Sequence, residues 1–344
     1  MSDVSEVSRR ANSAEQPYDL FIIGGGVNGC GIARDAAGRG LSVGLAEMND
    51  IASATSSSST KLFHGGLRYL EYFEFRLVRG SHIVTRKLYE HEKCYFFQGE
   101  DGRIIFTIPY ENEFTLIGTT DVDHPDLAAP PVCSDEETDY LLAFASSYLE
   151  TPVERDDIVA SFSGVRPLYN DGAGSASAAT RDYVLRLDDE GGLPLLNIFG
   201  GKITTYRKLA ESVMKEIRPF FGSMSGSWTA IAPLPGGDFA VDGFEQLVFD
   251  VETKYPFMPK SVARRLVRAY GTDSWRILQK IASVNDLGTD FGAGVFAAEL
   301  DWVVENEWVS SAEDFVWRRT RLGLRLSVEQ IAVIDDYIRQ RHSI

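Results

Sequence analysis

The chain has 344 residues, 44% of them hydrophobic and 24% charged, which is an ordinary globular composition with enough apolar material for two or three domains. Its formal net charge of -16 argues against general nucleic-acid binding, so an anionic substrate would need a locally basic pocket. The three cysteines are scattered and indicate a reducing compartment with neither a disulfide framework nor a metal cluster; they are Cys30, Cys94 and Cys133.

The first 16 residues are polar and acidic, so we expect a disordered tail that is neither a signal peptide nor a transit peptide. No apolar run along the chain has the length of a membrane span. Attachment to a membrane surface would then depend on a local patch.

Residues 18–39 have the pattern of a nucleotide-binding fold. A short apolar run over 18–23 predicts a buried parallel strand, and an alanine-rich segment after it predicts a helix packed closely on the sheet. The G-x-G-x-x-G spacing between them is formed by Gly24, Gly26 and Gly29. This spacing suits a tight turn, a close approach to a pyrophosphate and a helix start that binds anions. A second strand over 41–46 ends at Glu47, where an acid would bind a ribose. These residues predict dinucleotide binding and leave FAD and NAD as alternatives.

A serine-rich segment, residues 52–61, follows this acid. Its composition is also that of a flexible linker, but it is short and runs directly into the glycine-containing segment 62–70. Hydroxyl groups and glycines beside a nucleotide fold suit hydrogen bonding to the phosphates and ring edges of a cofactor. The residues alone leave both interpretations open.

The middle of the chain, over 81–120, has the pattern of an antiparallel sheet. Two β-rich runs joined by a short turn carry this prediction, 103–108 and 114–119. A helix is predicted over 135–149, where acidic residues at its start suit the helix dipole.

A second junction of strand, glycines and helix begins at the apolar strand 195–199. The strand leads through Gly200 and Gly201 into a helix with a threonine cap. The junction is either an ordinary connection or a helix start aimed at an electron-rich ring. Lys202 in the turn favours the functional interpretation.

The segment 233–237 (PLPGG) indicates a domain boundary, after which the pattern is helical to the end. Helix-start boxes are predicted at Ser311 with Asp314 and at Ser327 with Gln330. We expect a small helical domain over 238–344, whose core or interface holds Trp302, Trp308 and Trp317.

Several blocks of sequence, in a fixed order, carry a resemblance to a known family. They are 24–40 (GGGVNGCGIARDAAGRG), 54–71 (ATSSSSTKLFHGGLRYLE), 80–84 (GSHIV), 117–121 (IGTTD), 163–168 (SGVRPL), 180–183 (TRDY), 199–210 (FGGKITTYRKLA), 234–237 (LPGG) and 317–320 (WRRT). Over almost its whole length after the tail, the chain resembles the bacterial FAD-dependent (aerobic, quinone-linked) glycerol-3-phosphate dehydrogenases. The resemblance implies FAD as cofactor and the oxidation of sn-glycerol 3-phosphate to dihydroxyacetone phosphate, with electrons passed to a membrane quinone.

One departure from the family pattern is large. The segment 74–78 (EFRLV), which continues a helix in the family, runs here directly into Arg79 and the GSHIV block. In the family a long middle section separates them, with part of the substrate domain and a return strand whose Ala-Thr-Gly turn closes over the cofactor. We therefore expect a large internal deletion at Val78/Arg79, where a helix-like segment would meet a strand. A missing interior strand would expose apolar neighbours and ladder groups and cost stability.

The chemistry that the resemblance implies needs cations for a dianionic phosphate, a base for a hydroxyl proton, and a dipole or cation beside the reduced flavin. The catalytic residues that it implies are His82, Arg166 and Lys202. The substrate-binding residues that it implies are Arg68, Tyr69 and Arg181. The cofactor-binding residues that it implies are Gly24, Gly26, Gly29, Glu47, Thr55, Ser56, Ser57, Lys61, His64, Gly66, Gly201 and Thr204.

These assignments have structural alternatives. Arginines are often solvated surface charges, but Arg68 and Arg166 are favoured as phosphate ligands because their glycine-containing blocks resemble active-site loops. A surface charge at Arg181 and a core aromatic at Tyr69 stay open as alternatives. A lone histidine on a strand is usually structural, and only the resemblance selects His82 as the base, a role suited to an imidazole near neutral pH.

The expected fold is α/β (α+β overall), with a Rossmann-like FAD-binding domain, an antiparallel-sheet substrate domain and a small C-terminal helical domain. The FAD-binding domain is expected over 17–78 and 194–232, and an incomplete substrate domain over 79–193. The helical domain is expected over 238–344, and the disordered tail over 1–16.

The resemblance also implies partners and a location. It implies sn-glycerol 3-phosphate and a membrane quinone as partners, without a metal or nucleic acid, and a cytoplasmic protein at the inner face of the cytoplasmic membrane. It allows peripheral attachment and a homodimer. Two other functions stay open. A truncated, non-catalytic remnant would fit the abrupt junction, and an amine or amino-acid flavin oxidase would share the broad fold, although SGVRPL and GGKITTYRKLA argue against it.

Overall fold

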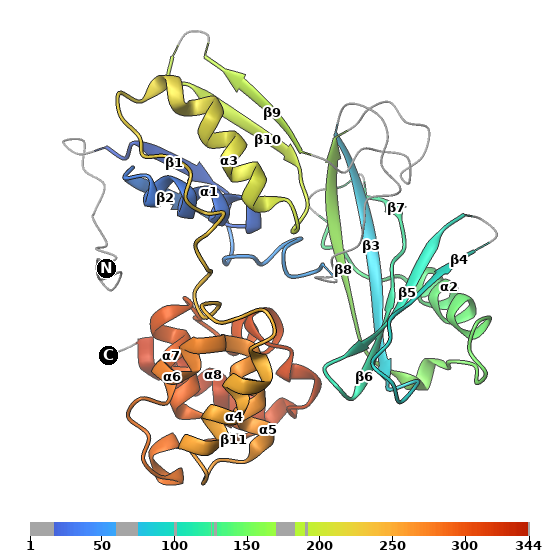
Figure 1. The fold of residues 1–344 in the computed structure, drawn as a ribbon. Coiled ribbons are helices and arrows are strands. Elements are labelled where there is room, and N and C mark those ends of the chain that lie inside the picture. The colour runs from blue at the N-terminus through green and yellow to red at the C-terminus, as the bar shows by residue number, and fades with distance from the viewer. Residues whose placement is uncertain are drawn as a thin grey trace. The chain divides into compact units, whose positions relative to one another are not determined.

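The computed structural model describes residues 17–59, 75–99, 102–124, 126, 129–169, 183–189 and 192–342. The chain divides into two compact units, Met1–Arg76 with Pro167–Ala230, and Leu77–Arg166 with Ile231–Ile344 (Figure 1). The expected boundary at residue 193 differs from this division. Strand Tyr183–Asp188 belongs to the first unit, because it pairs with strand Leu195–Gly200.

The first unit contains the predicted nucleotide-binding elements. Its helices and strands are β1 (Leu20–Ile23), α1 (Val27–Gly38), β2 (Val43–Ala46), β9 (Tyr183–Asp188), β10 (Leu195–Gly200), α3 (Tyr206–Ile217) and the 3-10 helix η2 (Arg218–Phe220). Among the described residues, β1 and β2 form a parallel pair, and β9 and β10 form an antiparallel pair. Helices α1 and α3 pack against each other around Ile32, Ala36, Leu209 and Met214. The predicted order of strand, glycines, helix and strand is confirmed.

Strand β1 is covered on one face and exposed on the other. Leu20 and Ile22 pack against the core of the first unit, whereas Phe21 is 55% exposed and Ile23 is 84% exposed. Strands of parallel sheets are normally covered on both faces and form continuous apolar runs, as the sequence LFII does. The sequence of β1 is therefore suited to burial on two faces, and one of them is exposed here.

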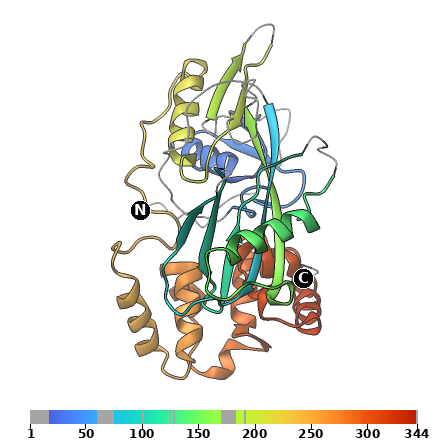
Figure 2. The same ribbon diagram turned by 90° about the vertical axis from the view of Figure 1, so that its right-hand side faces the viewer.

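The second unit begins with an antiparallel sheet. Its helices and strands are β3 (Phe75–Arg86), β4 (Tyr95–Gln98), β5 (Ile104–Tyr110), β6 (Phe114–Gly118), β7 (Val122–Asp123), α2 (Asp135–Ser146), η1 (Arg155–Asp157) and β8 (Ile158–Tyr169). The strand order is β4-β5-β6-β3-β7, and β8 also pairs with β3. Helix α2 covers one face of the sheet (Figure 2). On this face Leu141 and Ala145 pack with Ile83, Ile105 and Ile117. The predicted hairpin and helix in this region are confirmed.

Strand β3 runs without a break through the Val78/Arg79 junction. The expectation of a helix-like segment up to Val78 is wrong, because β3 already begins at Phe75. Val78 pairs with Asp123 of β7 and Arg79 with Val122, and β3 also pairs with β8. The residues before the junction suit a strand as well as a helix, so the neighbouring ladders decide between the two.

The rest of the second unit is helical and has its own core. Its elements are α4 (Phe244–Lys254), α5 (Lys260–Tyr270), η3 (Gly271–Asp273), α6 (Ser274–Ile277), η4 (Val284–Leu287), β11 (Asp290–Gly292), β12 (Val295–Phe296), α7 (Ala297–Asn306), the π-helix η5 (Asp314–Arg319), η6 (Leu322–Leu324) and α8 (Val328–His342). The core includes Leu266, Leu300, Phe315 and Ile334. Within the described ranges, no helix has the length and apolar character needed to cross a membrane.

Local signals in the helical region are largely confirmed. Both predicted helix-start boxes form, with reciprocal hydrogen bonds in each of the pairs Ser311–Asp314 and Ser327–Gln330. Trp302 and Trp317 pack against the core. Trp308 lies outside the core, since this side chain is 66% exposed where the chain turns with a φ of 53°, and its place in an interface stays a prediction.

Candidate active site

The glycine loop between β1 and α1 has the backbone geometry that its spacing predicts. Gly24 adopts a φ of 110°, which side chains with a Cβ rarely allow. A Cβ at Gly29 would collide with the carbonyl oxygen of Gly24, so only glycine lets the first turn of α1 lie this close to the loop. Such a helix start presents backbone N–H groups and the positive end of its dipole to an anion.

Two predicted cofactor residues contact this loop. The Glu47 carboxylate at the end of β2 accepts a hydrogen bond from the Gly25 N–H at 2.6 Å, and this bond is the main reason that the pKa of Glu47 is lowered. Ser56 Oγ accepts from the Val27 N–H at 2.9 Å, at the first residue of α1. The serine-rich segment therefore lies against the nucleotide-binding loop, which favours the cofactor interpretation over a free linker.

The second glycine junction lies beside the first one in the same unit. The Asn28 side chain of α1 donates from Nδ2 to the Gly200 carbonyl oxygen at 3.1 Å, and Gly201 adopts a φ of 97°. The Lys202 N–H donates to Thr205 Oγ1 at 3.1 Å, just before α3. Among the described residues, no donor reaches the buried Oδ1 atom of Asn28. A buried carbonyl oxygen normally has a donor, so this atom suits the N–H or O–H of a bound group. The residues present thus fit a dinucleotide cofactor.

In the second unit, His82 occupies a buried place on the sheet. It pairs with Gly118 of β6, and a Cβ at Gly118 would lie 2.8 Å from His82 Cγ, so the missing side chain makes room for the ring. The imidazole stacks on Phe162 of β8, with ring centroids 5.0 Å apart. His82 is 3% exposed, so its ring is shielded from bulk water.

Arg166 lies on the same face of the sheet as His82. A Cβ at Gly80 would lie 2.6 Å from Arg166 Cζ, so the guanidinium group rests on the bare backbone of β3. Gly80 and His82 are two residues apart in one strand and point to the same face, about 7 Å from each other. The expectation that Arg166 lies on a loop is wrong, because the residue is part of strand β8, which pairs with β3.

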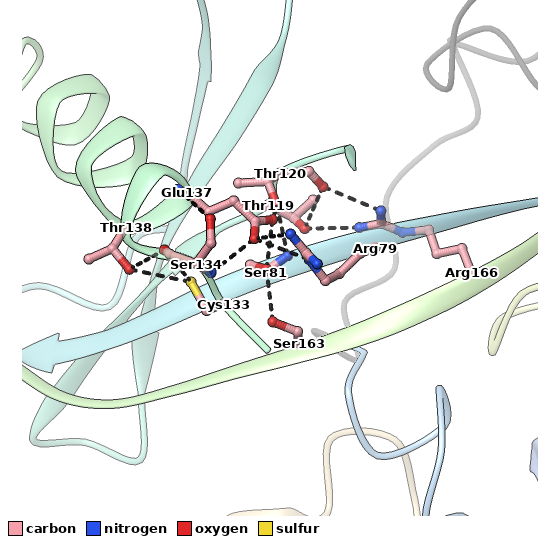
Figure 3. A network of polar contacts seen from close by, with 10 residues as sticks. All are labelled: Arg79, Ser81, Thr119, Thr120, Cys133, Ser134, Glu137, Thr138, Ser163 and Arg166. Atoms are coloured by element: carbon pink, nitrogen blue, oxygen red, sulfur yellow. Dashed lines mark hydrogen bonds and ion pairs between the residues drawn. The ribbon is translucent and has the colours of Figure 1, made fainter. Parts of the chain in front are cut away.

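The turn between β6 and β7 holds the Arg166 guanidinium (Figure 3). Nη1 forms an ion pair with Asp121 Oδ1 at 2.8 Å, and Nη2 donates to Thr119 Oγ1 at 2.9 Å. The Arg166 side chain is 23% exposed and that of Asp121 14%. A planar cation held at a fixed place can bind a phosphate through two parallel hydrogen bonds.

Other residues of this face escaped the sequence analysis. Arg321 lies over the Phe162 ring, with its Cζ atom 5.3 Å from the ring centroid, and so adds a second cation near His82. Burial raises the pKa of the neighbouring Tyr110, to which Arg321 also forms a hydrogen bond. Gly80 and Gly118 were present in recognised blocks, but only their contacts with distant side chains explain them.

The remaining predicted site residues fall into two groups. Thr55 and Thr204 are exposed, and Ser57 Oγ donates to the Ala52 carbonyl oxygen at 2.6 Å, all in the first unit. Outside the described residues lie Lys61, His64, Gly66, Arg68, Tyr69 and Arg181. The structure thus brings together His82 with Arg166 in the second unit, and the glycine loop with Glu47, Ser56 and the Gly200–Lys202 turn in the first.

Comparison with known proteins decides the family. A sequence model of the FAD-dependent oxidoreductases matches residues 19–78 and 73–207, and a model of the C-terminal domain of alpha-glycerophosphate oxidase matches residues 227–339. The glycerol-3-phosphate dehydrogenase of Pseudomonas aeruginosa is 33% identical, with 94% of this chain and 96% of the relative covered. The chain belongs to the FAD-dependent glycerol-3-phosphate dehydrogenase family. The family's cofactor is FAD, in agreement with the glycine loop.

A second relative and a solved structure are also similar to this chain. The D-erythritol 1-phosphate dehydrogenase of Brucella abortus is 31% identical, with 92% of this chain and 97% of the relative covered. A crystal structure of the glycerol-3-phosphate dehydrogenase from Bacillus halodurans, complexed with FAD, has a TM-score of 0.78 at 23% identity and covers 96% of this chain and 91% of that one. This likeness supports the fold, namely an FAD-binding domain, an antiparallel sheet and a helical C-terminal region.

The comparisons also bear on the expected deletion. The alignment with the glycerol-3-phosphate dehydrogenase of Pseudomonas aeruginosa spans 490 positions, whereas this chain has 344 residues, so that relative carries segments that this chain lacks. The two matches to the oxidoreductase family meet at residues 73–78, directly before Arg79. Both findings agree with a large segment missing at Val78/Arg79.

Proposed function

We propose that this chain oxidises sn-glycerol 3-phosphate to dihydroxyacetone phosphate, with hydride transfer to FAD and onward transfer of electrons to a quinone. One observation carries the proposal. The Arg166 guanidinium rests on Gly80, beside the His82 imidazole on the same face of the sheet. A cation for a phosphate and a base for a hydroxyl proton are the two groups that oxidation of a phosphorylated secondary alcohol requires.

Each residue has a defined role in this proposal. Arg166 binds the substrate phosphate, and His82 accepts the proton of the C2 hydroxyl group. Bound FAD supplies the acceptor for the hydride that leaves C2, so the alcohol loses two electrons and two protons in total. Lys202, in the turn that precedes α3, contributes positive charge beside the reduced ring. Arg68, Tyr69 and Arg181 complete substrate binding, a role that rests on the family resemblance alone.

The cofactor site in this proposal uses the first unit. The start of α1, with Gly24, Gly26 and Gly29, binds the pyrophosphate, and Glu47 binds the ribose. Thr55, Ser56, Ser57, Lys61, His64 and Gly66 line the site, and Gly201 and Thr204 lie against the ring. A membrane quinone, peripheral attachment to the inner face of the cytoplasmic membrane and a homodimer are carried from the resemblance as further parts of the proposal.

Other functions make different predictions. The 31% identity with a D-erythritol 1-phosphate dehydrogenase favours a longer polyol phosphate as a second candidate substrate. A non-catalytic remnant is favoured by the family matches that meet at residues 73–78. The match of residues 227–339 to a domain of alpha-glycerophosphate oxidase argues against an amine or amino-acid oxidase.

The decisive experiment is an anaerobic spectral titration of the purified protein. The visible spectrum measures bound flavin, and sn-glycerol 3-phosphate, D-erythritol 1-phosphate and glycine are then added separately. We expect a flavin spectrum that is bleached by sn-glycerol 3-phosphate at the lowest concentration. Arg166→Lys should raise the concentration for half bleaching by about tenfold or more, because a lysine cannot form the paired hydrogen bonds. The matched control is Arg155→Lys, an exposed arginine of the same unit, which should change nothing.

The other outcomes of this titration each reject a part of the proposal. Bleaching by D-erythritol 1-phosphate at lower concentration would replace the substrate. A flavin spectrum that no phosphorylated polyol bleaches would reject the catalytic role while keeping the cofactor. A colourless protein that gains no flavin on incubation with FAD would support the non-catalytic remnant.

A further inference from the structure

A buried carboxylate lies on the opposite face of the sheet from Arg166 and His82. Glu137, near the start of α2, is 5% exposed. Its Oε1 atom accepts from Ser81 Oγ at 2.8 Å and from Thr120 Oγ1 at 2.6 Å. Its Oε2 atom accepts from Arg79 at 2.7 Å and from the Ser134 N–H at 3.1 Å (Figure 3). The carboxylate thus joins β3, the β6–β7 turn and α2.

Two serines of this network are adjacent in sequence to the stacked rings of His82 and Phe162. Ser81 precedes His82 in β3, and Ser163 follows Phe162 in β8, while the two serine Oγ atoms lie 2.8 Å apart. Because Ser81 gives its single proton to Glu137, Ser163 is the donor between the two serines. The serines therefore tie β3 to β8 behind the stacked His82 and Phe162 rings.

The link from Glu137 to Arg166 runs through Thr120. Thr120 donates its hydroxyl proton to Glu137 and accepts a hydrogen bond from the Ser81 N–H at 2.9 Å. The Thr120 carbonyl oxygen accepts from Arg166 Nη1 at 3.4 Å, and the residues on either side, Thr119 and Asp121, also bind the guanidinium. Only one residue, Thr120, therefore separates the carboxylate from the Arg166 guanidinium.

The charge of Glu137 is maintained by these contacts. Burial alone would raise the pKa of the carboxyl, but hydrogen bonds from Thr120, Ser134, Ser81 and Arg79 outweigh burial and the pKa is lowered. A buried carboxylate is costly unless all its acceptor sites are used, and replacing such a group by an apolar one is often neutral for stability. The capping box with Ser134 gives a local reason for a glutamate or glutamine at this place, whereas the bonds of Oε1 to Ser81 and Thr120 fix the geometry of the turn.

We propose that Glu137 is a positioning residue for Arg166. Through Thr120 it holds the β6–β7 turn so that Asp121 and Thr119 keep the guanidinium over Gly80, and through Ser81 it holds the strand of His82. The proposal rests on the proposed function in one respect, namely that Arg166 binds the substrate phosphate. The geometric part, that Glu137 determines where the guanidinium lies, stands without it.

The test compares Glu137→Gln with Glu136→Gln, the adjacent and exposed glutamate of the same helix. The first readout is the side-chain N–H signal of Arg166 in NMR spectra of the arginine-labelled full-length protein, assigned through Arg166→Lys. The second is the affinity for dihydroxyacetone phosphate by calorimetry, and the third is the melting temperature. We expect Glu137→Gln to shift or broaden the Arg166 signal and to weaken binding about tenfold, while Glu136→Gln does neither.

A double-mutant cycle separates positioning from a general loss of structure. If Glu137 acts through Arg166, the losses in affinity from Glu137→Gln and Arg166→Lys should not add. Additive losses, or a lower melting temperature with an unchanged Arg166 signal and unchanged affinity, would overturn the proposal. Should Glu137→Gln fail to fold, Thr120→Val must shift the same signal and Thr120→Ser must restore it, and failure of this pair would also overturn it.

Failure of the proposed function gives a different result. If the unmodified protein does not bind dihydroxyacetone phosphate, the phosphate-binding role of Arg166 is rejected. The Arg166 signal then still decides the geometric part. A shift in Glu137→Gln but not in Glu136→Gln supports positioning, and equal spectra refute it.

Discussion

Replacing Gly80 by alanine should disturb the site without disturbing the fold. The added Cβ would lie 2.6 Å from both Cζ and Nη1 of Arg166, well inside the usual contact distance. These atoms are the far end of a flexible side chain, so the guanidinium can leave its place over β3. Gly80 itself lies in a strand and does not have a positive φ, so alanine adds no backbone strain.

The magnitudes follow from these contacts. Displacing the guanidinium loses at least one charge-assisted hydrogen bond to a phosphate, worth about 1.5–3 kcal/mol. That loss corresponds to about 10- to 150-fold weaker binding of dihydroxyacetone phosphate. For the fold, some strain is offset by the lower entropy of an unfolded chain with alanine, a gain of about 0.4–1 kcal/mol. Moving the guanidinium also weakens its contacts with Asp121 and Thr119, so the free energy of unfolding should fall by about 1–3 kcal/mol, with the fold retained.

The assay is calorimetric titration with dihydroxyacetone phosphate, together with urea unfolding of the same preparation. Gly226→Ala is the matched control, because Gly226 is exposed and an added Cβ there meets nothing within 4 Å. Unchanged affinity in Gly80→Ala would refute the assignment of Arg166 as the phosphate ligand in this geometry. A large loss of stability would refute the claim that the guanidinium can move aside.

Three further changes test other parts of the structure. Gly118→Ala places its Cβ 2.8 Å from Cγ of the buried, stacked His82 ring, so urea unfolding should detect a loss of about 1–3 kcal/mol, and an unaltered stability would mean that the ring is not confined. Ile23→Thr on the exposed face of β1 should cost less than about 0.5 kcal/mol in the same assay. A cost of 2 kcal/mol or more, as for a core residue, would mean that this face is covered in solution. Glu211→Gln removes a carboxyl whose pKa is lowered from 4.5 to about 2, chiefly by a hydrogen bond from Lys208. Because the folded pKa lies below the unfolded one, the carboxylate stabilises the fold above pH 4.5 and this stabilisation is lost as the pH falls towards 2. The difference in melting temperature between Glu211→Gln and the unmodified protein should be full at pH 7 and shrink below pH 4.5, and a gap independent of pH would contradict this.

Local sequence predicted the elements whose causes are local. The glycine spacing indicated β1, α1 and β2, and short-range boxes such as Ser327 with Gln330 correctly indicated helix starts. Strand or helix over 75–78 could not be decided in this way. The residues there suit both, and the pairing of Val78 with Asp123 arises from a strand far along the chain.

The candidate site was predictable only in part, because its geometry is made by contacts between distant residues. His82 entered through the resemblance, and the reason for Gly118 became visible only when the ring was found against it. Acidic residues at 135–137 indicated a helix start, which is correct. Locally, Glu137 differs from Glu136 as the third residue of a capping box with Ser134, which the S-x-x-E spacing indicates. Its contacts with Arg79 and Ser81, by contrast, come from a distant strand and have no local signal.

The Val78/Arg79 junction has unequal consequences for the two units. In the second unit it falls inside β3, where Val78 is buried and Arg79 binds Glu137, so the strand that carries His82 is paired and anchored on both sides. In the first unit β1 retains an exposed apolar face, as expected if the missing segment once covered it. Because the site residues of the sheet depend on contacts within the second unit, binding of dihydroxyacetone phosphate should be retained even in preparations that hold little flavin. A protein with full flavin content and no affinity for dihydroxyacetone phosphate would contradict this expectation. It would mean that the missing segment impairs the sheet of the second unit rather than the first unit.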